Sequence, residues 1–525
     1  MISASLLRVA CLVVSLSTSF ALAERARFVS AADVCAREAG AAALCRDNTE
    51  PVLTHDFNGP SLSSRTAPAL SARAPLASLV HFPPNATKIN DLDFVLNGPG
   101  APGVYNSSQS PEYGVYNWCN MPHVRAGEYV TPPEDYKLKY VEVIHRHHKR
   151  TPYASNTFFK EDVKWQCEGE GVVHYVITLL TYEHCALLMM LKWNAFTDDQ
   201  NPWTSSVGPG FVGTNCQLPQ ITAEGLQDSY QHGVDLRSVY ADIFGWNDTL
   251  DTETVKIRVT NNVITSQVAG GVLRGLFPGV SDVQVHVQPE GIDSLEPQYS
   301  CAAADDVRAA YTTGDNGTEW QDHLNATAPL FAKLDAVSGI EQEDDAGWHT
   351  WFDHYYDNLS AKQCHGKSLP CSVNDTALCV TQEEANEVYR LGNWEYSYIY
   401  RDATNSTLYS ALKYGAWVLE LRAHLEGAIT GESTYYHNVA HDGSISALLG
   451  FLQISKMVWP GMGSEIVFEL YEKSSEHFIR VLFGGQPLET STPLGTLNLI
   501  PVEKFIDYID SMLGSGSELY AACQG

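Results

Sequence analysis

The sequence predicts an α/β protein: a three-layer sandwich with a mostly parallel central sheet and a helical cap insertion. From about residue 136, strand-like and helix-like segments alternate, which is typical of a parallel sheet covered on both faces. Between about 300 and 405 the strand signals stop and apolar residues recur at helical spacing, which indicates the cap. The expected strands are 138–145, 255–260, 283–288 and 435–440, and the expected helices are 222–241, 264–276, 408–426 and 444–454.

The chain divides into successive regions on composition. The segment that follows the first 23 residues mixes alanine-rich pieces with Pro, Ser and Gly, so we expect an extended arm with little regular structure. The expected regions are a signal peptide (1–23), the N-terminal arm (24–135), the first part of the α/β core (136–300), the helical cap (301–430), the second part of the core (431–515) and a C-terminal tail (516–525).

The first 23 residues have the pattern of a secretory signal: one positive charge, an apolar run and a small-residue end at Ala23. We therefore expect a secreted, extracellular protein. The chain has 12 cysteines, and an even subset should form disulfides outside the cell. Eight N-x-Ser/Thr sequons predict glycosylation at several of these positions: Asn85, Asn106, Asn247, Asn316, Asn325, Asn358, Asn374 and Asn405.

A formal net charge of −29 restricts the partners of the chain. Such an acidic protein is not expected to bind nucleic acid. After residue 23, no apolar run approaches the roughly 18 residues of a membrane span. An anionic substrate must therefore be attracted by a local basic pocket. The oligomeric state stays open.

One basic segment stands out in this acidic chain: residues 146–152, Arg-His-His-Lys-Arg-Thr-Pro, which directly follow the expected strand 138–145. Arginine side chains bind phosphoryl oxygens in a bidentate way, and a neutral histidine can attack phosphorus. The segment therefore suits phosphate chemistry. A solvated basic patch is the simpler alternative, but it would not need a buried strand leading into it.

A second candidate is His441-Asp442, which follows the expected strand 435–440 and precedes a helix. A single His-Asp pair is most often structural. Two such segments, each at the end of a strand of a parallel sheet, would however present their side chains at the same edge.

Together these motifs resemble the histidine acid phosphatases, the second branch of the histidine phosphatase superfamily, whose pattern is Arg-His-x-x-Arg-x-Pro followed much later by His-Asp. The resemblance extends from about residue 136 to 512 and implies a phosphoglycerate mutase-like fold. It implies that His147 is the nucleophile and that Asp442 is the general acid. Arg146, Arg150 and His441 would bind the phosphate, and neither a metal nor another cofactor would be needed.

The chain departs from the family pattern at two positions. His148 replaces the usual glycine, where its bulk would either narrow the pocket or add a contact. Ile264 falls where the family has a third phosphate-binding arginine, a loss on the order of 1.5–3 kcal/mol in phosphate binding. Arg274, Lys149 or the backbone amides of Asn261 and Asn262 are the candidates to compensate.

The leading hypothesis is a secreted acid phosphatase that hydrolyses small phosphomonoesters through a phosphohistidine. A phytase-type inositol phosphate phosphatase is one alternative, although it would require a wider basic pocket. The other is a catalytically weak relative that binds phosphorylated ligands, which the loss at Ile264 motivates.

Overall fold

The computed structural model describes residue 76 and residues 79–524, except 102–104, 107–114, 117, 157–164, 166, 168–172, 178–186, 192–193, 199, 203–211, 247–250, 280–282, 314–316, 341–346 and 432–433. These residues lie in the compact unit Ser71–Gly525. The expected signal peptide and the first part of the N-terminal arm lie outside the described residues.

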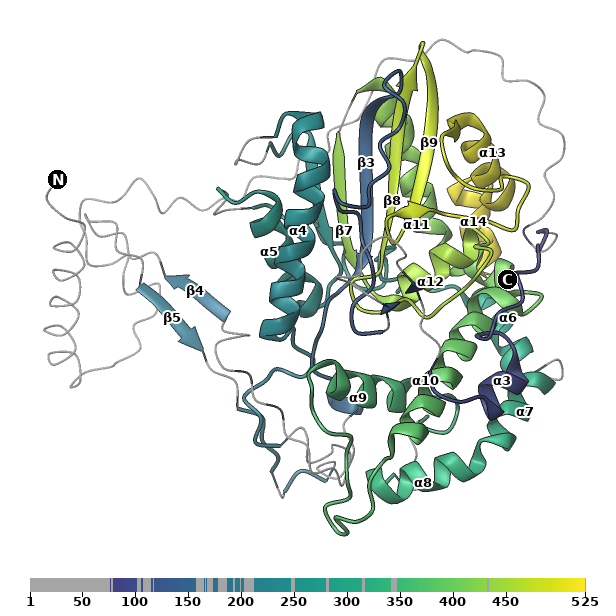
Figure 1. The fold of residues 1–525 in the computed structure, drawn as a ribbon. Helices are drawn as coiled ribbons and strands as arrows, with labels where there is room; N and C mark the ends of the chain where they lie inside the picture. The colour runs from purple at the N-terminus through teal and green to yellow at the C-terminus, as the bar shows by residue number, and fades with distance from the viewer. Residues whose placement is uncertain are drawn as a thin grey trace, which may run out of the picture. The chain divides into compact units, whose positions relative to one another are not determined.

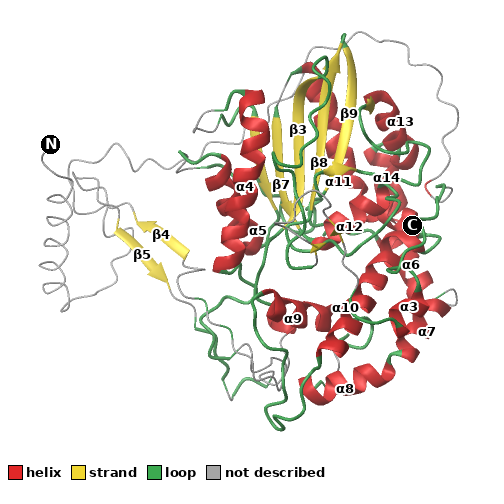
Figure 2. Cartoon of the chain, in the orientation of Figure 1, coloured by secondary structure: helices red, strands yellow, loops and turns green. Residues whose placement is uncertain are grey.

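A mixed sheet forms the centre of the fold (Figures 1 and 2). Its neighbouring strands follow the order β10-β9-β8-β3-β7-β6, and β11 pairs with β9. The strands β6, β7 and β3 are parallel. Strand β8 is the antiparallel neighbour of β3, and β9 pairs antiparallel with β8. The strand bounds are Lys137–Arg146 (β3), Val255–Val259 (β6), Tyr435–Ala440 (β7), Glu465–Lys473 (β8), Glu476–Phe483 (β9), Gln486–Pro487 (β10) and Ile500–Pro501 (β11).

Helices cover both faces of the sheet, which completes the expected three layers (Figure 1). Helices α4 (Ala223–Phe244) and α5 (Val263–Leu276) pack on one face. On the other face lie α11 (Ser406–Thr430), α12 (Asp442–Phe451) and α13 (Val502–Leu513). The side chains of β3 point alternately to the two faces of the sheet, which explains this arrangement. Val141 and Val143 pack in the apolar core beneath α4 and α5, whereas Tyr140 and Ile144 pack in the core beneath α11, α12 and α13.

A group of helices lies beneath one end of the sheet in Figure 1, where α8, α9 and α10 are labelled. The bounds of the helices in this part of the chain are Ala302–Thr312 (α6), Thr318–Ala326 (α7), Ala328–Ser338 (α8), Asp353–Cys364 (α9) and Gln382–Ser397 (α10), followed by the π-helical turn Tyr398–Asp402 (η4). Residue range 406–430, which the sequence placed at the end of the cap, is α11 and contacts β3 and α12. The boundaries of the cap stay a prediction.

Seven of the eight expected elements are confirmed, with shifts at their ends. The exception is the expected strand 283–288, which was wrong. Only His286 pairs, through a single parallel bridge to Arg258 at the edge of β6. The alternating valines of this segment suggested a strand, but Val287 is exposed and Pro289, which has no N–H, follows at once, so the ladder does not extend.

Several short elements were not predicted. They are α3 (Leu92–Asn97), the two-residue strands β1 (Tyr105–Asn106) and β2 (Val115–Tyr116), the 3-10 turn η2 (Ala154–Asn156), the antiparallel pair β4 (Val173–Ile177) and β5 (Leu187–Leu191), and α14 (Gly516–Gln524). Helix α14 occupies the range that the sequence left as a tail, and a disulfide ties Cys523 to Cys301.

Disulfide formation is confirmed. The other three pairs among the described residues are Cys119–Cys364, Cys167–Cys216 and Cys371–Cys379. None of the described helices is long and apolar enough to cross a membrane. Of the sequon asparagines, Asn85, Asn325, Asn374 and Asn405 are exposed, whereas Asn358 is fully buried and is not available to a glycan in the folded chain.

Candidate active site

The register of the sheet brings the two expected motifs together. Strands β3 and β7 are parallel neighbours, and Arg146 pairs with Ala440 at their ends. His147 and His441 are each the next residue, so they leave the sheet side by side. Their rings are 5.5 Å apart, and the backbone N–H of His147 donates to the carbonyl of Ala440 at 3.0 Å.

His147 is buried and held in one orientation. Its Nδ1 lies 3.0 Å from the backbone oxygen of His148, so Nδ1–H donates to this carbonyl and Nε2 keeps its lone pair. Burial, followed by the charges of Arg150 and Arg146, holds the pKa of His147 well below its ordinary value. The ring is therefore neutral, as a nucleophilic histidine must be.

Arg150 lies beside this lone pair. Its Nε is 3.5 Å from Nε2 of His147, a distance at the outer limit of a hydrogen bond. The other end of the guanidinium is fixed by Asp357 of α9: Nη2 lies 2.9 Å from Oδ1 and Nη1 lies 3.3 Å from Oδ2. Asp357 also accepts from the side chain of Asn156 at 2.8 Å. The carboxylate thus positions Arg150 against the histidine.

Arg146, the last residue of β3, is fixed between two partners. Its Nη1 donates to the carbonyl of Pro460 at 2.7 Å, and Nη2 lies 2.9 Å from Oδ2 of Asp442. Its buried Nε has no hydrogen-bond partner within the described part of the chain. This donor remains available to an oxygen of a ligand.

Asp442 is the first residue of α12. One of its oxygens accepts from Trp459 Nε1 at 2.9 Å, and the other accepts from the N–H of Gly443 at 2.8 Å. Burial raises the pKa of Asp442, but the charge of Arg146, the Trp459 hydrogen bond and the charge of Arg150 together hold this pKa below its ordinary value. Without a ligand, Asp442 is an anion.

His441 is positioned from the side of β6. Its Nε2 lies 2.9 Å from Oγ1 of Thr260 and 3.4 Å from Oε2 of Glu296. It is buried, and its ring and that of His147 form a T-shaped pair.

Arg146, Arg150 and Asp442 border a cavity of about 160 Å³, whereas His147 and His441 are not among its lining residues. Its lining is rich in aromatic rings and contains both arginines. The residues are Arg146, Arg150, Tyr153, Asn156, Trp351, Asp353, Tyr356, Asp357, Ser360, Tyr396, Asp442 and Trp459.

Sequence reasoning missed the contribution of α9. Asp353, Tyr356, Asp357 and Ser360 follow the i, i+3, i+4, i+7 spacing of one helical face, and this face borders the cavity. The spacing was visible in the sequence, but nothing there placed the helix over His147.

Asp353 differs from Asp442 in its charge. Burial, with the nearby charges of Asp442 and Asp357, raises the pKa of Asp353 to about 8. The cavity therefore contains one carboxyl group that keeps its proton at acid and neutral pH.

The structure shows where the two departures from the family pattern, Ile264 and His148, lie relative to the cavity. Ile264 is fully buried in an apolar cluster with Val259 and Val268, and it does not border the cavity. The proposed substitutes do not border it either: Lys149 pairs with Asp228 at 3.1 Å, Arg274 is exposed, and Asn261 and Asn262 line a different hollow.

His148 neither narrows the cavity nor contributes to its lining. Its ring lies among buried histidines on the α4 side of the sheet. The expectation that its bulk would affect the pocket was therefore wrong, because the side chain leaves the loop on the opposite side.

Comparison with known proteins identifies the family. A sequence model described as histidine phosphatase superfamily (branch 2) matches residues 137–484, which include both motifs. The chain belongs to this superfamily. This member is 24% identical to Counting factor 60 of Dictyostelium discoideum, over 72% of this chain and 86% of the relative. It is also 25% identical to Prostatic acid phosphatase of Mus musculus, over 56% of this chain and 78% of that relative.

Two further proteins are similar to this chain. Lysophosphatidic acid phosphatase type 6 of Bos taurus is 24% identical over 74% of this superfamily member and 86% of the relative. Among solved structures, the apo form of Hafnia alvei phytase superposes with a TM-score of 0.48 at 12% identity, over 75% of this chain and 99% of the other.

Proposed function

We propose that this protein is an acid phosphatase that hydrolyses phosphomonoesters through a phosphohistidine on His147. One observation carries the proposal: the unprotonated Nε2 of a buried, neutral histidine lies 3.5 Å from Nε of Arg150, and Arg150 borders a cavity together with Arg146 and Asp442. A nucleophile next to two cationic donors that line a cavity suits phosphoryl transfer, in which positioning and charge stabilisation supply most of the rate.

In the first step, Nε2 of His147 attacks phosphorus while the bond from phosphorus to the ester oxygen breaks. Arg146 and Arg150 hold the non-bridging oxygens, and His441 adds a contact. Asp442 gives its proton to the leaving alkoxide, which departs as the alcohol. In the second step, the Asp442 carboxylate takes a proton from water, the water oxygen bonds to phosphorus, and the phosphorus–nitrogen bond breaks. Inorganic phosphate leaves, and both residues return to their initial states.

The charge of the substrate resolves an apparent conflict at Asp442. A general acid must carry a proton, yet Arg146 and Arg150 lower the pKa of this carboxyl. A bound phosphate monoester neutralises part of this positive charge, so the pKa of Asp442 rises when substrate binds. Acid pH then favours the protonated form, which supports an enzyme that works best in acid.

The cavity favours small monoesters over inositol hexakisphosphate. It is only about 160 Å³, no lysine occurs among the described residues that line it, and each of its two arginines is already paired with a carboxylate. The rings of Tyr356 and Tyr396 each stack on Trp459, at 3.7 and 3.8 Å between centroids. These aromatic walls suit an apolar or aryl alcohol as the leaving group.

We also propose secretion and glycosylation. The signal-like segment at 1–23, four disulfides and the exposed sequon asparagines support an extracellular location. Detection of the glycosylated chain in culture medium would test this part of the proposal.

The decisive experiment is to trap the intermediate. Purified protein is mixed with a ³²P-labelled aryl phosphate at acid pH and quenched in alkaline denaturant, in which phosphohistidine survives. We expect labelled protein and release of phosphate from the wild type, and neither from a folded His147→Ala variant. Unchanged hydrolysis in this variant would overturn the mechanism, and wild-type protein that neither acquires label nor releases phosphate would indicate a ligand-binding relative instead. Parallel assays with inositol hexakisphosphate separate the phytase alternative.

A further inference from the structure

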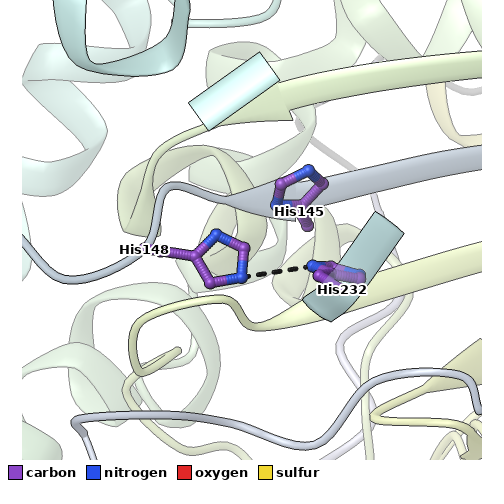
Figure 3. Close-up of side chains that lie close together, drawn as sticks. All are labelled: His145, His148 and His232. Atoms are coloured by element: carbon purple, nitrogen blue, oxygen red, sulfur yellow. Dashed lines mark hydrogen bonds between the residues drawn. The ribbon is translucent and has the colours of Figure 1, made fainter. Parts of the chain in front are cut away.

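Three buried histidines, one of them on the loop that carries His147, lie close together (Figure 3). His145 comes from the end of β3, His148 from the following loop and His232 from α4. One ring nitrogen of each lies within 4.8 Å of the corresponding nitrogens of the other two. None of the three borders the catalytic cavity, and the proposed reaction uses none of them.

The outer nitrogens of two rings are fixed by acceptors. Nε2 of His232 lies 2.7 Å from the Glu465 carboxylate, and Nδ1 of His145 lies 2.9 Å from the backbone oxygen of Arg146. The carbonyl can only accept, so Nδ1 of His145 carries the hydrogen and Nε2 keeps a lone pair. His232 has a lone pair on Nδ1 in the tautomer whose Nε2–H donates to Glu465. A carboxylate or a backbone carbonyl behind the ring is the usual support of a metal-binding histidine, because it fixes the tautomer and the ring orientation.

The spacing of one pair of inner nitrogens also fits a metal ion. Nε2 of His148 lies 3.3 Å from Nδ1 of His232, the contact drawn as a dashed line in Figure 3. In a tetrahedral site with metal–nitrogen distances of 2.0–2.1 Å, neighbouring nitrogens are about 3.3 Å apart. Nδ1 of His148 is buried and has no partner in the described part of the chain. No hydrogen bond at this nitrogen therefore fixes the tautomer, and Nδ1 can carry the hydrogen while Nε2 binds the ion.

The surroundings supply a further nitrogen. All three histidines are buried. His437, whose Nε2 lies 2.9 Å from Nε2 of His145, is a candidate for a fourth ligand, and the Glu465 side chain lies next to His232.

We propose that His145, His148 and His232 form a binding site for a first-row transition-metal dication such as Zn²⁺. Imidazole nitrogen is a preferred ligand of these ions. The ion would connect β3, the loop that carries His147 and His148, and α4. It would hold this loop in place without taking part in phosphoryl transfer. Metal-free protein can therefore still be tested for phosphatase activity, independently of this proposal.

The test measures metal binding directly. Chelator-treated, untagged protein is titrated with Zn²⁺ in competition with a chromophoric chelator, and with Co²⁺ while the visible spectrum is recorded. We expect one equivalent of tightly bound Zn²⁺ and the intense ligand-field bands of four-coordinate Co²⁺. His148→Gln and His232→Gln should each weaken binding at least 100-fold. His323→Gln is the matched control, because His323 is equally buried on a helix and its Nε2 lies 2.9 Å from the Glu395 carboxylate, outside the cluster.

Two results would overturn the site. One is folded wild-type protein, checked by circular dichroism, that binds no stoichiometric Zn²⁺. The other is binding that survives both cluster substitutions, which would assign the ion to histidines elsewhere on the chain. If one cluster variant fails to fold, the other still locates the ion, and wild-type protein that binds no Zn²⁺ overturns the site without either variant.

Discussion

Nη2 of Arg146 lies 2.9 Å from Oδ2 of Asp442, so the expected phosphate ligand and the expected general acid form a buried ion pair. In the ligand-free protein this pair keeps Asp442 ionised. A phosphate group that binds Arg146 competes for the same charge. Substrate binding and protonation of the acid are thereby coupled through one guanidinium group.

This coupling predicts how Asp442→Asn affects different leaving groups. An alkyl alcohol needs the proton that Asp442 supplies, so kcat for an alkyl phosphate should fall by about 10²–10⁴-fold. An aryl phosphate with an acidic phenol departs without this proton, so formation of its phosphohistidine should be much less affected, and the intermediate should accumulate. Rapid-quench measurements of the rate of phosphohistidine formation with both esters test this. If Asp442→Asn slowed this step equally for the two esters, the proton would come from another group.

Asp357 should act as a positioning residue for Arg150. Asp357→Asn keeps the size of the side chain but removes the charge that fixes the guanidinium, so we expect KM for a monoester to rise about 10-fold with a smaller change in kcat. Ser360→Ala, on the same face of α9, is the control and should change KM by less than about 2-fold. A fall in kcat alone would contradict the role in binding.

Ile264→Arg should not restore the third phosphate ligand of the family. Ile264 is buried in an apolar cluster, so an arginine there would bury an unpaired charge and lower the free energy of unfolding by more than about 2 kcal/mol. Ile264→Val should cost only about 0.5–1.5 kcal/mol. Urea unfolding and phosphate inhibition constants measure both effects. Tighter phosphate binding in the arginine variant would show that this side chain reaches the cavity.

Asp353 should make stability depend on pH. In the unfolded chain Asp353 ionises near its ordinary pKa of 3.8, but in the folded protein its pKa is about 8, so the folded state binds the extra proton between these values. Its contribution to the free energy of unfolding is therefore present below pH 4 and is lost as the pH rises toward 8.

Asp353→Asn removes this ionisation. The variant should gain stability relative to the wild type as the pH increases from about 4 to 8, which urea unfolding at several pH values measures with the disulfides intact. The exposed Asp305→Asn on α6 is the control, and its difference from wild type should not change appreciably over this range. A constant difference for Asp353→Asn would contradict the raised pKa.

Much of the fold could be predicted because the local signals were strong. The strand before Arg146 and the strand before His441 both contain β-branched and aromatic residues, and the helices between them have long amphipathic patterns. The segment 283–288 had a similar strand pattern but pairs at His286 alone, because pairing depends on the neighbouring strand and not on the segment itself. The antiparallel pairing of β8 with β3, and of β9 with β8, likewise depends on which strands become neighbours in the sheet, so the separate segments do not predict it.

The sequence by itself determined the two motifs, their order and the family that they indicate, because covalent order and residue type are sufficient for a pattern. Only the tertiary structure decided which groups share the cavity. Asp353 and Asp357 lie more than 200 residues beyond His147 in the chain, and the packing of α9 brings them to the cavity that Arg150 borders. The structure also places His148 and Ile264 outside the lining of this cavity, because the direction of a side chain depends on the backbone and its neighbours.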